Sequence, residues 1–173
     1  MYKRQYLSLS IRLQQEFGLR REESLKFIPS YAIKRNHVEL KGSWTKGGIP
    51  RTIPILTAAQ KALIQELQAS IPANQSLIPE HKSFKQQENF YKKALRNAGF
   101  KNLHGLRHAY TQKRYQDLVN HETKGCGWLC PKQGGKGQQG MSIEERRIDE
   151  HARALISNEL GHSRVEITKA YLG

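Results

Sequence analysis

Two segments of this sequence combine side chains that bind phosphate with one that can attack it. The first is His104-Gly105-Leu106-Arg107, and the second runs from Leu160-Gly161-His162 to Tyr171. Arginine offers phosphate oxygens a planar fork of N–H donors. Histidine can donate or accept a proton near neutral pH, and a tyrosine phenolate is a nucleophile. The pattern therefore indicates an enzyme that cuts DNA.

The net charge favours the same kind of partner. The 173 residues include 29 Lys and Arg against 15 Asp and Glu, which leaves a formal charge of +14. Such an excess favours a polyanion, because binding to phosphates releases their counterions. On charge alone, a basic protein with no nucleic-acid partner remains the alternative.

Length and composition indicate one globular domain. Charged residues make up 25% and hydrophobic residues 37%, which excludes the composition typical of disordered chains. No apolar stretch approaches the roughly 20 residues that span a bilayer, and the N-terminus lacks a signal-peptide pattern. Two cysteines give no disulfide framework. We therefore expect a cytoplasmic protein without a membrane partner.

Helices dominate the pattern. Four hydroxyl residues are each followed three positions later by Gln or Glu, which is typical of a capping box at a helix N-terminus. These pairs are Thr57/Gln60, Ser83/Gln86, Ser142/Glu145 and Ser163/Glu166. They predict helices over 58–69, 84–98, 143–159 and 164–171, and further helices are expected over about 7–17, 20–28 and 105–119.

Strand character is confined to one region. Tyr31–Ile33, His37–Trp44 and Arg51–Ile55 are separated by polar or Gly-rich turns and predict a small three-stranded antiparallel meander. Its second turn would be residues 46–50, with Lys46 at the tip.

The stretch from His121 to Met141 is rich in glycine and has no periodicity, which predicts a mobile loop. Cys126 and Cys130, with His121 nearby, allow the hypothesis of half a zinc site, but there is no second cysteine pair. We favour an irregular surface insertion in which Trp128 and Leu129 pack against the core.

Taken together, the motifs resemble those of the tyrosine recombinase (phage integrase) family. They are Gly18-Leu19-Arg20-x-x-Glu23, Lys46 in a β-turn, His104-x-x-Arg107, Leu160-Gly161-His162 and Tyr171, in the family's order and with His162 and Tyr171 nine positions apart. The chain looks most similar to integrases of bacterial integrative and mobile genetic elements, which carry a Gly-rich insertion before the Leu-Gly-His motif.

The resemblance implies that Arg20 and Arg107 clamp the scissile phosphate. Glu23, one helical turn further on, would orient Arg20 or support the fold. The resemblance also implies that Lys46 protonates the 5′ oxygen as it leaves. Arg21, next to Arg20, is an alternative for the first arginine of the clamp. Lys41 is an alternative to Lys46 as the proton donor.

For the remaining residues, the resemblance implies that Tyr171 is the nucleophile that forms a 3′-phosphotyrosine intermediate. His162 would hydrogen-bond the phosphate, and His104 would exchange a proton with the nucleophile or donate to the phosphate. His108 is the next histidine candidate, with a packing role as the alternative. Tyr110 and Tyr115 also follow the His104 motif, but they lack the family spacing.

The resemblance also implies a fold and partners. The expected class is α+β, mainly α, with the DNA breaking-rejoining enzyme fold over residues 1–173 and a Gly-rich insertion at about 121–141. The residues before the first motif leave no room for the usual N-terminal core-binding domain. The implied activity is site-specific DNA recombination without a metal or other cofactor, by a tetramer on paired duplex DNA sites, with an accessory directionality factor as a further partner.

Three alternatives stay open. The first is a noncatalytic or clamp-deficient DNA-binding regulator, and the second is strand relaxation of the type IB topoisomerase kind. The third is a zinc-stabilised interaction module, which rests on the two cysteines alone.

Overall fold

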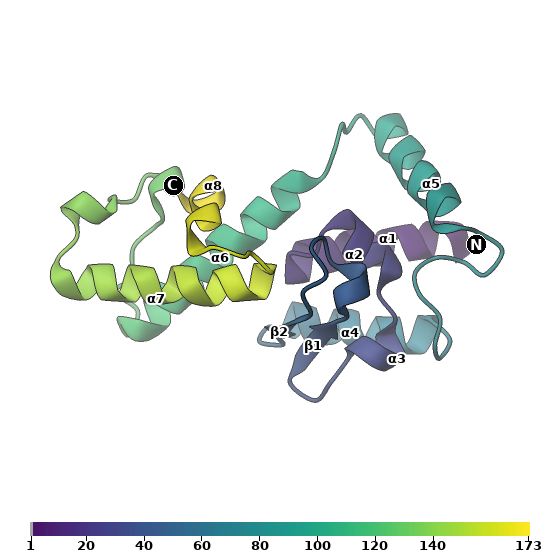
Figure 1. Cartoon of the computed structure of the whole chain (residues 1–173), viewed down its shortest axis with the longest axis horizontal. Coiled ribbons are helices and arrows are strands. Elements are labelled where there is room, and N and C mark those ends of the chain that lie inside the picture. The colour runs from purple at the N-terminus through teal and green to yellow at the C-terminus, as the bar shows by residue number, and fades with distance from the viewer. Residues whose placement is uncertain (1) are drawn as a thin grey trace. The chain divides into compact units, whose positions relative to one another are not determined.

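Helices make up most of the chain, which confirms the predicted mainly α fold (Figure 1). The computed structural model describes residues 2–173, with side chains from residue 4 onward. Contacts divide the chain into two compact units, Met1–Arg107 and His108–Gly173. The two units are described separately below.

The described part of the first unit contains helices α1 to α5, a small sheet and the start of α6. Its elements are α1 (Tyr2–Phe17), α2 (Arg21–Lys26), α3 (Pro29–Ala32), β1 (His37–Leu40), the 3₁₀ turn η1 (Gly42–Trp44), β2 (Arg51–Pro54), α4 (Ala58–Ser70) and α5 (Phe84–Asn97). The second unit contains most of α6 (His104–Glu122), the 3₁₀ turns η2 (Pro131–Gln133) and η3 (Gln138–Gly140), α7 (Ile143–Leu160), η4 (Val165–Thr168) and α8 (Lys169–Leu172).

The predicted three-stranded meander is wrong in its first strand. Within residues 2–173, β1 and β2 form a two-stranded antiparallel sheet with Leu40 opposite Arg51. Pro29 occupies the first helical position of α3, where its fixed φ favours a helical turn, so the chain coils where a strand was expected. Ile33 keeps a single β-bridge to Val38.

The core of the first unit is built along α1. Leu9, Leu13 and Phe17, one helical turn apart, are fully buried. Leu63 and Leu67 of α4 are likewise fully buried, and α1 and α4 are in contact. This packing holds the C-terminal end of α1, and therefore the motif that follows it, in a fixed place.

Three of the four predicted capping boxes are confirmed. The side chains of Thr57, Ser83 and Ser142 each accept a hydrogen bond from the backbone N–H three residues on. In return, the backbone N–H of each cap residue donates to the side-chain oxygen of that Gln or Glu. The box at Ser163/Glu166 is wrong, because the backbone is still extended at Arg164 and the chain then forms η4 before α8.

In the second unit, a buried polar network joins α6 and α7. Asp149, fully buried, accepts hydrogen bonds from Tyr115 Oη at 2.6 Å, from Arg153 Nε at 2.8 Å and from Gln138 Nε2 at 2.9 Å. Burial, followed by the bond to Asp149, raises the pKa of the Tyr115 phenol. The network fixes the Gly-rich segment, because two residues of this segment take part in it. Gln138 donates to Asp149, and Trp128 Nε1 donates to Tyr115 Oη at 3.0 Å.

The Gly-rich segment is irregular apart from η2 and η3, as predicted. Trp128 is half-buried, but Leu129 is 39% exposed, so the expected packing of Leu129 against the core is wrong. Cys130, the next residue, is buried in its place.

Over the described residues, no helix combines the length and the apolar character that crossing a membrane requires.

Candidate active site

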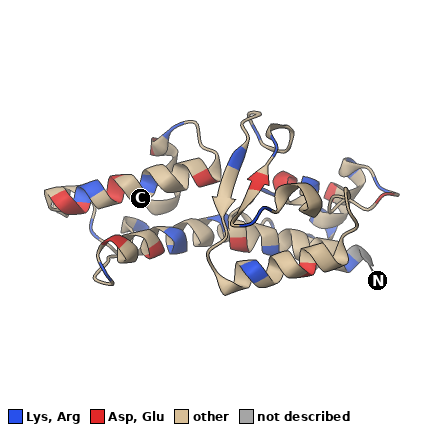
Figure 2. Cartoon of the chain, turned by 90° about the horizontal axis from the view of Figure 1, so that it is seen from below, with Lys and Arg blue, Asp and Glu red and all other residues tan. Residues whose placement is uncertain are grey.

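Lys and Arg residues are spread along the chain (Figure 2), and several of their side chains line one pocket of the first unit. Arg20, Lys46, His104 and Arg107 all line one surface pocket of about 340 Å³. They come from the start of α2, the β1–β2 connection and the first turn of α6. The four residues that the motifs predict in this unit are therefore brought together by the fold.

Arg20 is held by Glu23, one turn further along α2. The backbone N–H of Arg20 donates to Glu23 Oε2 at 2.7 Å, and Arg20 Nη1 donates to Glu23 Oε1 at 3.0 Å. The Arg20 side chain is 30% exposed, so the guanidinium borders the pocket while its inner edge is bound. Glu23 therefore contacts both the backbone and the side chain of Arg20.

Glu23 is itself fully buried and binds a second arginine. Arg51 Nη1 and Nη2 donate to its two carboxylate oxygens at 3.0 and 2.7 Å. Burial alone would raise the pKa of the Glu23 carboxyl, but the bonds and charges of Arg51 and Arg20 outweigh it, so this pKa is lowered. Glu23 therefore stays ionised between two cations.

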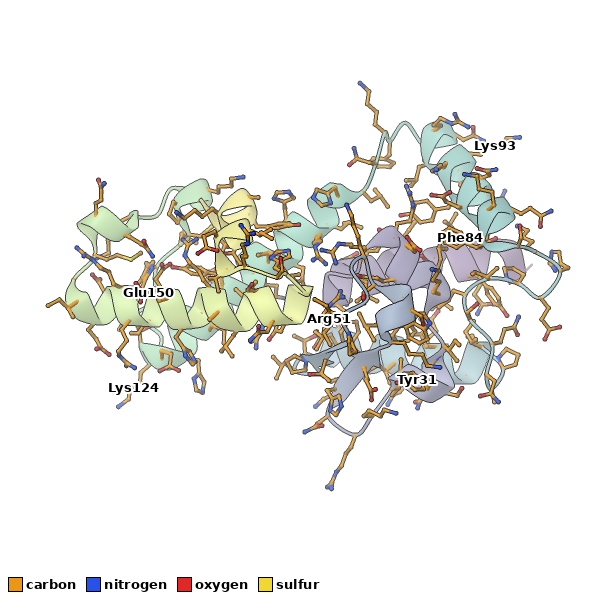
Figure 3. The ribbon with its side chains drawn as sticks, viewed as in Figure 1. Tyr31, Arg51, Phe84, Lys93, Lys124 and Glu150 are labelled. Carbon is orange, nitrogen blue, oxygen red and sulfur yellow. The ribbon has the colours of Figure 1, made fainter. Side chains whose placement is uncertain are left out.

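Arg51, labelled in Figure 3, is not among the residues that the motifs predict. Its signal is period-2 alternation in β2: Arg51 and Ile53 are both buried, whereas Thr52 between them is exposed. An arginine in phase with a buried isoleucine requires a buried acidic partner. In this structure the partner is Glu23.

Arg107 connects α6 to the end of α1. It is 2% exposed, and Nη1 donates to the backbone carbonyl of Gly18. Gly18 has φ +61°, a left-handed conformation that favours glycine, just after the last residue of α1. The Gly18-Leu19-Arg20 motif thus supplies both the turn that Arg107 binds and the arginine beside it in the pocket.

His104 opens α6 and is exposed. Its backbone N–H donates to Asn102 Oδ1 at 3.1 Å, which satisfies one of the N–H groups left unpaired at a helix start. His104 and Arg107 lie on one face because they are three residues apart in a helix. Both line the pocket.

Lys46 lies in a turn that depends on glycines. Gly47 and Gly48 have φ of +97° and +73°. A Cβ at Gly42 would come within 2.3 Å of the Gly48 carbonyl oxygen, so the two backbone segments can approach this closely only without a side chain there. Among the described residues, the Lys46 ammonium has no hydrogen bond or ion pair.

The second unit contains the other two predicted residues, and they are in contact. Gly161 ends α7 in the left-handed conformation at φ +65°, and His162 N donates to the Ser157 carbonyl at 2.9 Å. The His162 ring stacks on that of Tyr171, with centroids 5.5 Å apart and planes at 21°. Tyr171 is 7% exposed.

His108 packs against the same tyrosine, with ring centroids 4.6 Å apart. In the sequence His108 is the next histidine candidate, with a packing role as the alternative, and in the structure its ring contacts that of the predicted nucleophile. His108 lies one helical turn before Gln112, which binds α8.

Backbone contacts fix α8, the yellow helix in Figure 1. Gln112 Nε2 donates to the Tyr171 carbonyl at 3.2 Å, Lys132 Nζ to that of Ala170 at 2.6 Å and Arg153 Nη1 to that of Gly173 at 2.9 Å. A four-residue helix has little stability of its own. These donors from α6, η2 and α7 therefore determine where Tyr171 lies.

The rival residues have structural partners. Lys41 Nζ lies 3.9 Å from the centroid of the Tyr31 ring, a cation–π contact. Tyr110 Oη donates to Glu159 at 3.0 Å, and Tyr115 donates to Asp149. Arg21 binds Glu88 at 2.7 Å.

The described residues contain no group of three or more His, Cys, Asp and Glu side chains placed to hold a metal ion. Cys126 is exposed, whereas Cys130 is buried with its Sγ 3.4 Å from Gln133 Oε1.

Comparison with known protein families gives a match to the family described as Integrase over residues 2–113, more than half of the 173 residues. The chain belongs to the integrase family. The matched residues of this integrase-family chain include Arg20, Lys46, His104 and Arg107, whereas His162 and Tyr171 lie beyond them. No curated protein matches the chain.

Solved structures with a similar fold include XerH site-specific recombinase bound to palindromic difH substrate in a post-cleavage complex. That chain is 19% identical, with a TM-score of 0.58 over 99% of this chain and 43% of its own. The pre-cleavage complex of XerH with difH is 17% identical, with a TM-score of 0.56 over 99% of this chain and 44% of its own. The integrase-family chain therefore has the tyrosine recombinase catalytic fold and spans less than half the length of these structures.

Proposed function

We propose that this chain is the catalytic domain of a site-specific recombinase that cleaves and rejoins duplex DNA through a 3′-phosphotyrosine intermediate. The observation that carries the proposal is the pocket of the first unit, in which Arg20, Lys46, His104 and Arg107 meet. All four belong to the part of the chain that matches the integrase family. The assignment of DNA as substrate is supported by the charge of +14.

The first unit supplies phosphate binding and a proton. Arg20 and Arg107 present guanidinium groups to the nonbridging oxygens and stabilise the charge of the pentacoordinate transition state. His104, at the N-terminal end of α6, donates to the phosphate or exchanges a proton with the nucleophile. Lys46, on its exposed turn, donates a proton to the departing 5′ oxygen.

The second unit supplies the nucleophile. Tyr171 Oη forms a bond to phosphorus, and the bond between phosphorus and the 5′ oxygen breaks. The phenol proton passes to a histidine, and the free 5′ hydroxyl retains the proton from Lys46. His162 and His108 fix the tyrosine ring through their ring contacts, and His162 also hydrogen-bonds the phosphate.

The bond to Tyr171 is still a phosphodiester, so a 5′ hydroxyl of another strand can attack it and restore DNA without ATP. Exchange between two duplexes requires several copies of the enzyme, and we propose a tetramer on paired sites. An accessory factor would set the balance of integration and excision. The reaction as proposed uses side chains alone, without a metal cofactor.

The proposal is tested by covalent trapping. Purified protein is incubated in EDTA with a pool of nicked duplexes of randomised sequence and separated by denaturing electrophoresis. We expect a DNA-linked band with the wild type and with Tyr31→Phe, a control on a tyrosine that binds Glu39 elsewhere in the first unit, and no band with Tyr171→Phe.

A band that persists in Tyr171→Phe would contradict the assigned nucleophile. If the wild type binds the DNA but no band forms, the noncatalytic regulator becomes the better description. Relaxation of supercoiled DNA without any joining of two duplexes would favour the topoisomerase alternative.

A further inference from the structure

The pocket that contains Arg20 and Arg107 has more cationic side chains than the proposed reaction uses. Arg21, Lys92 and Lys101 also line it. They come from α2, from α5 and from the loop between α5 and α6. None of the three has a role in the proposed reaction, and Arg21 occupies an unspecified position of the Gly18-Leu19-Arg20-x-x-Glu23 motif.

Two of these cations are held by one carboxylate. Glu88 is 8% exposed and binds Arg21 Nη2 at 2.7 Å and Lys92 Nζ at 3.0 Å. The hydrogen bond from Lys92 lowers the pKa of Glu88 most, and together with the nearby charges it outweighs the effect of burial, so the carboxylate stays charged. Lys85 approaches the same carboxylate at 3.6 Å.

The exposure of these groups indicates which way they face. The side chains of Arg21 and Lys92 are 41% and 42% exposed, whereas that of Glu88 is 11% exposed. The carboxylate therefore lies beneath the cations and fixes them, while parts of both remain accessible from the pocket. Lys101 is exposed and makes no hydrogen bond or ion pair within residues 4–173.

The charges at the pocket do not balance, because Glu88 binds both Arg21 and Lys92, and Lys101 adds a third cation. Such a cluster favours an anion with several oxygen acceptors. Successive phosphates of a DNA strand carry one charge each at short intervals, so a strand that places one phosphate at Arg20 and Arg107 brings the next within the same neighbourhood.

We propose that Arg21, Lys92 and Lys101 form a second phosphate subsite, which binds a DNA backbone phosphate adjacent to the one that is cleaved. Glu88 is the positioning residue of this subsite. The inference rests on the proposed function for the identity of the ligand. It assigns these residues to the binding of DNA and not to the chemical step.

If the cluster had a purely structural role, in which Glu88 links α2 to α5, loss of Lys85 and loss of Lys92 should have similar effects on DNA binding. Lys85 shares Glu88 but is 74% exposed and does not line the pocket. Lys85→Ala is therefore a matched control for Lys92→Ala. Thermal unfolding of each variant shows that it is folded before binding is measured.

The affinity of each variant for a short duplex of mixed sequence is measured between about 0.05 and 0.2 M salt. Lys92→Ala and Lys101→Ala should each reduce the slope of log affinity against log salt by about 1, and the double variant by about 2, whatever the DNA sequence. Lys85→Ala should keep the wild-type slope. A wild-type slope in the double variant, or an equal loss in Lys85→Ala, would overturn the subsite.

A second measurement identifies the phosphate and separates the two proposals. Neutral methylphosphonates are placed one at a time along nicked duplexes from the trapped pool. At one position beside the cleaved phosphate, the methylphosphonate should weaken DNA binding by the wild type but not by the double variant. On unmodified DNA at saturating concentration, covalent trapping by the double variant should stay within about twofold of wild type. If no position behaves in this way while trapping succeeds, the subsite fails and the proposed function stands. If the slopes change as expected but the wild type forms no covalent band, the subsite stands as a DNA contact and the proposed reaction fails.

Discussion

Arg51 of β2 binds Glu23 of α2 through both carboxylate oxygens, at 3.0 and 2.7 Å, although the two residues are 28 positions apart. The same carboxylate binds the backbone and the side chain of Arg20. The β1–β2 hairpin thus holds Arg20 in the pocket through the buried Glu23. The geometry of the pocket therefore depends on Arg51, which does not line it.

Glu23→Gln should destabilise the first unit strongly. The substitution leaves Arg51, with a side chain that is 4% exposed, without its charged partner, and loss of one partner of a buried pair costs about 3–5 kcal/mol. The free energy of unfolding in urea measures the effect. Glu22 directly precedes Glu23, and Glu22→Gln removes only an exposed ion pair with Lys26. This control should change the free energy of unfolding by less than about 1 kcal/mol. Equal effects of the two substitutions would contradict the role of the buried pair.

The stabilisation by Glu23 should depend on pH. Its pKa is lower in the folded chain than the ordinary 4.5, so the folded state binds its proton less readily than the unfolded state. The contribution is therefore complete above the ordinary pKa and is lost as pH falls through the folded one. Urea unfolding of wild type and Glu23→Gln from pH 7 to pH 3 should show their difference shrinking below about pH 4.5. A difference that stays constant would rule this linkage out.

Tyr171 should have separable structural and chemical roles. Tyr171→Phe keeps the ring against His108 and His162 and should cost no more than about 1.5 kcal/mol, the value of a hydrogen bond. Tyr171→Ala removes a buried ring and should cost about 3–5 kcal/mol. Differential scanning calorimetry compares them, and similar melting temperatures for the two variants would mean that the ring contacts contribute little.

Arg20 and Arg107 should contribute differently to the stability of the fold but equally to catalysis. Arg107→Ala leaves the buried Gly18 carbonyl without this donor and should cost about 1–3 kcal/mol. Arg20→Ala, with Arg51 still bound to Glu23, should cost less than about 1 kcal/mol. Each should slow strand cleavage by about 10²- to 10³-fold. Single-turnover cleavage and urea unfolding measure the two effects, and a normal cleavage rate in Arg20→Ala would remove it from the site.

Lys46 should act as the acid for the leaving group. Lys46→Ala should slow cleavage by about 10²- to 10⁴-fold on normal DNA. On DNA whose 5′ bridging oxygen is replaced by sulfur, the leaving thiolate needs no proton, so the variant should approach the wild-type rate. Lys41→Ala, which removes the cation–π contact with Tyr31, is the control and should cleave both substrates at about the wild-type rate. An equal defect of Lys46→Ala on both substrates would indicate phosphate binding instead.

The sequence predicted those parts of the fold that local chemistry determines. The capping pairs at Thr57, Ser83 and Ser142 place three helix starts because the hydrogen bonds involved lie within four residues. The pair at Ser163 has the same letters, but the backbone at Arg164 remains extended and the pattern has no effect. The missing strand has a local cause as well, because Pro29 at the first helical position favours a helical turn where the pattern of Tyr31–Ile33 predicts a strand.

The candidate site was predictable from spacing where its residues share a turn or a helix. His104 and Arg107 are an example, and the pocket that they share with Arg20 and Lys46 agrees with the motif order. The buried partner of Glu23 was not found, because Arg51 is linked to it only through the fold. The same holds for Glu88, which binds Arg21 across 67 positions of sequence. Long-range ion pairs of this kind have no local pattern.

The two cysteines differ in accessibility, with Cys126 exposed and Cys130 buried. Maleimide reagents react with an accessible thiolate, so the unmodified chain already offers one preferred position for a fluorophore. That position lies in the Gly-rich segment, a few residues before the Trp128 that binds Tyr115. A label there would report on the surroundings of the second unit when DNA is added, without the introduction or removal of any residue.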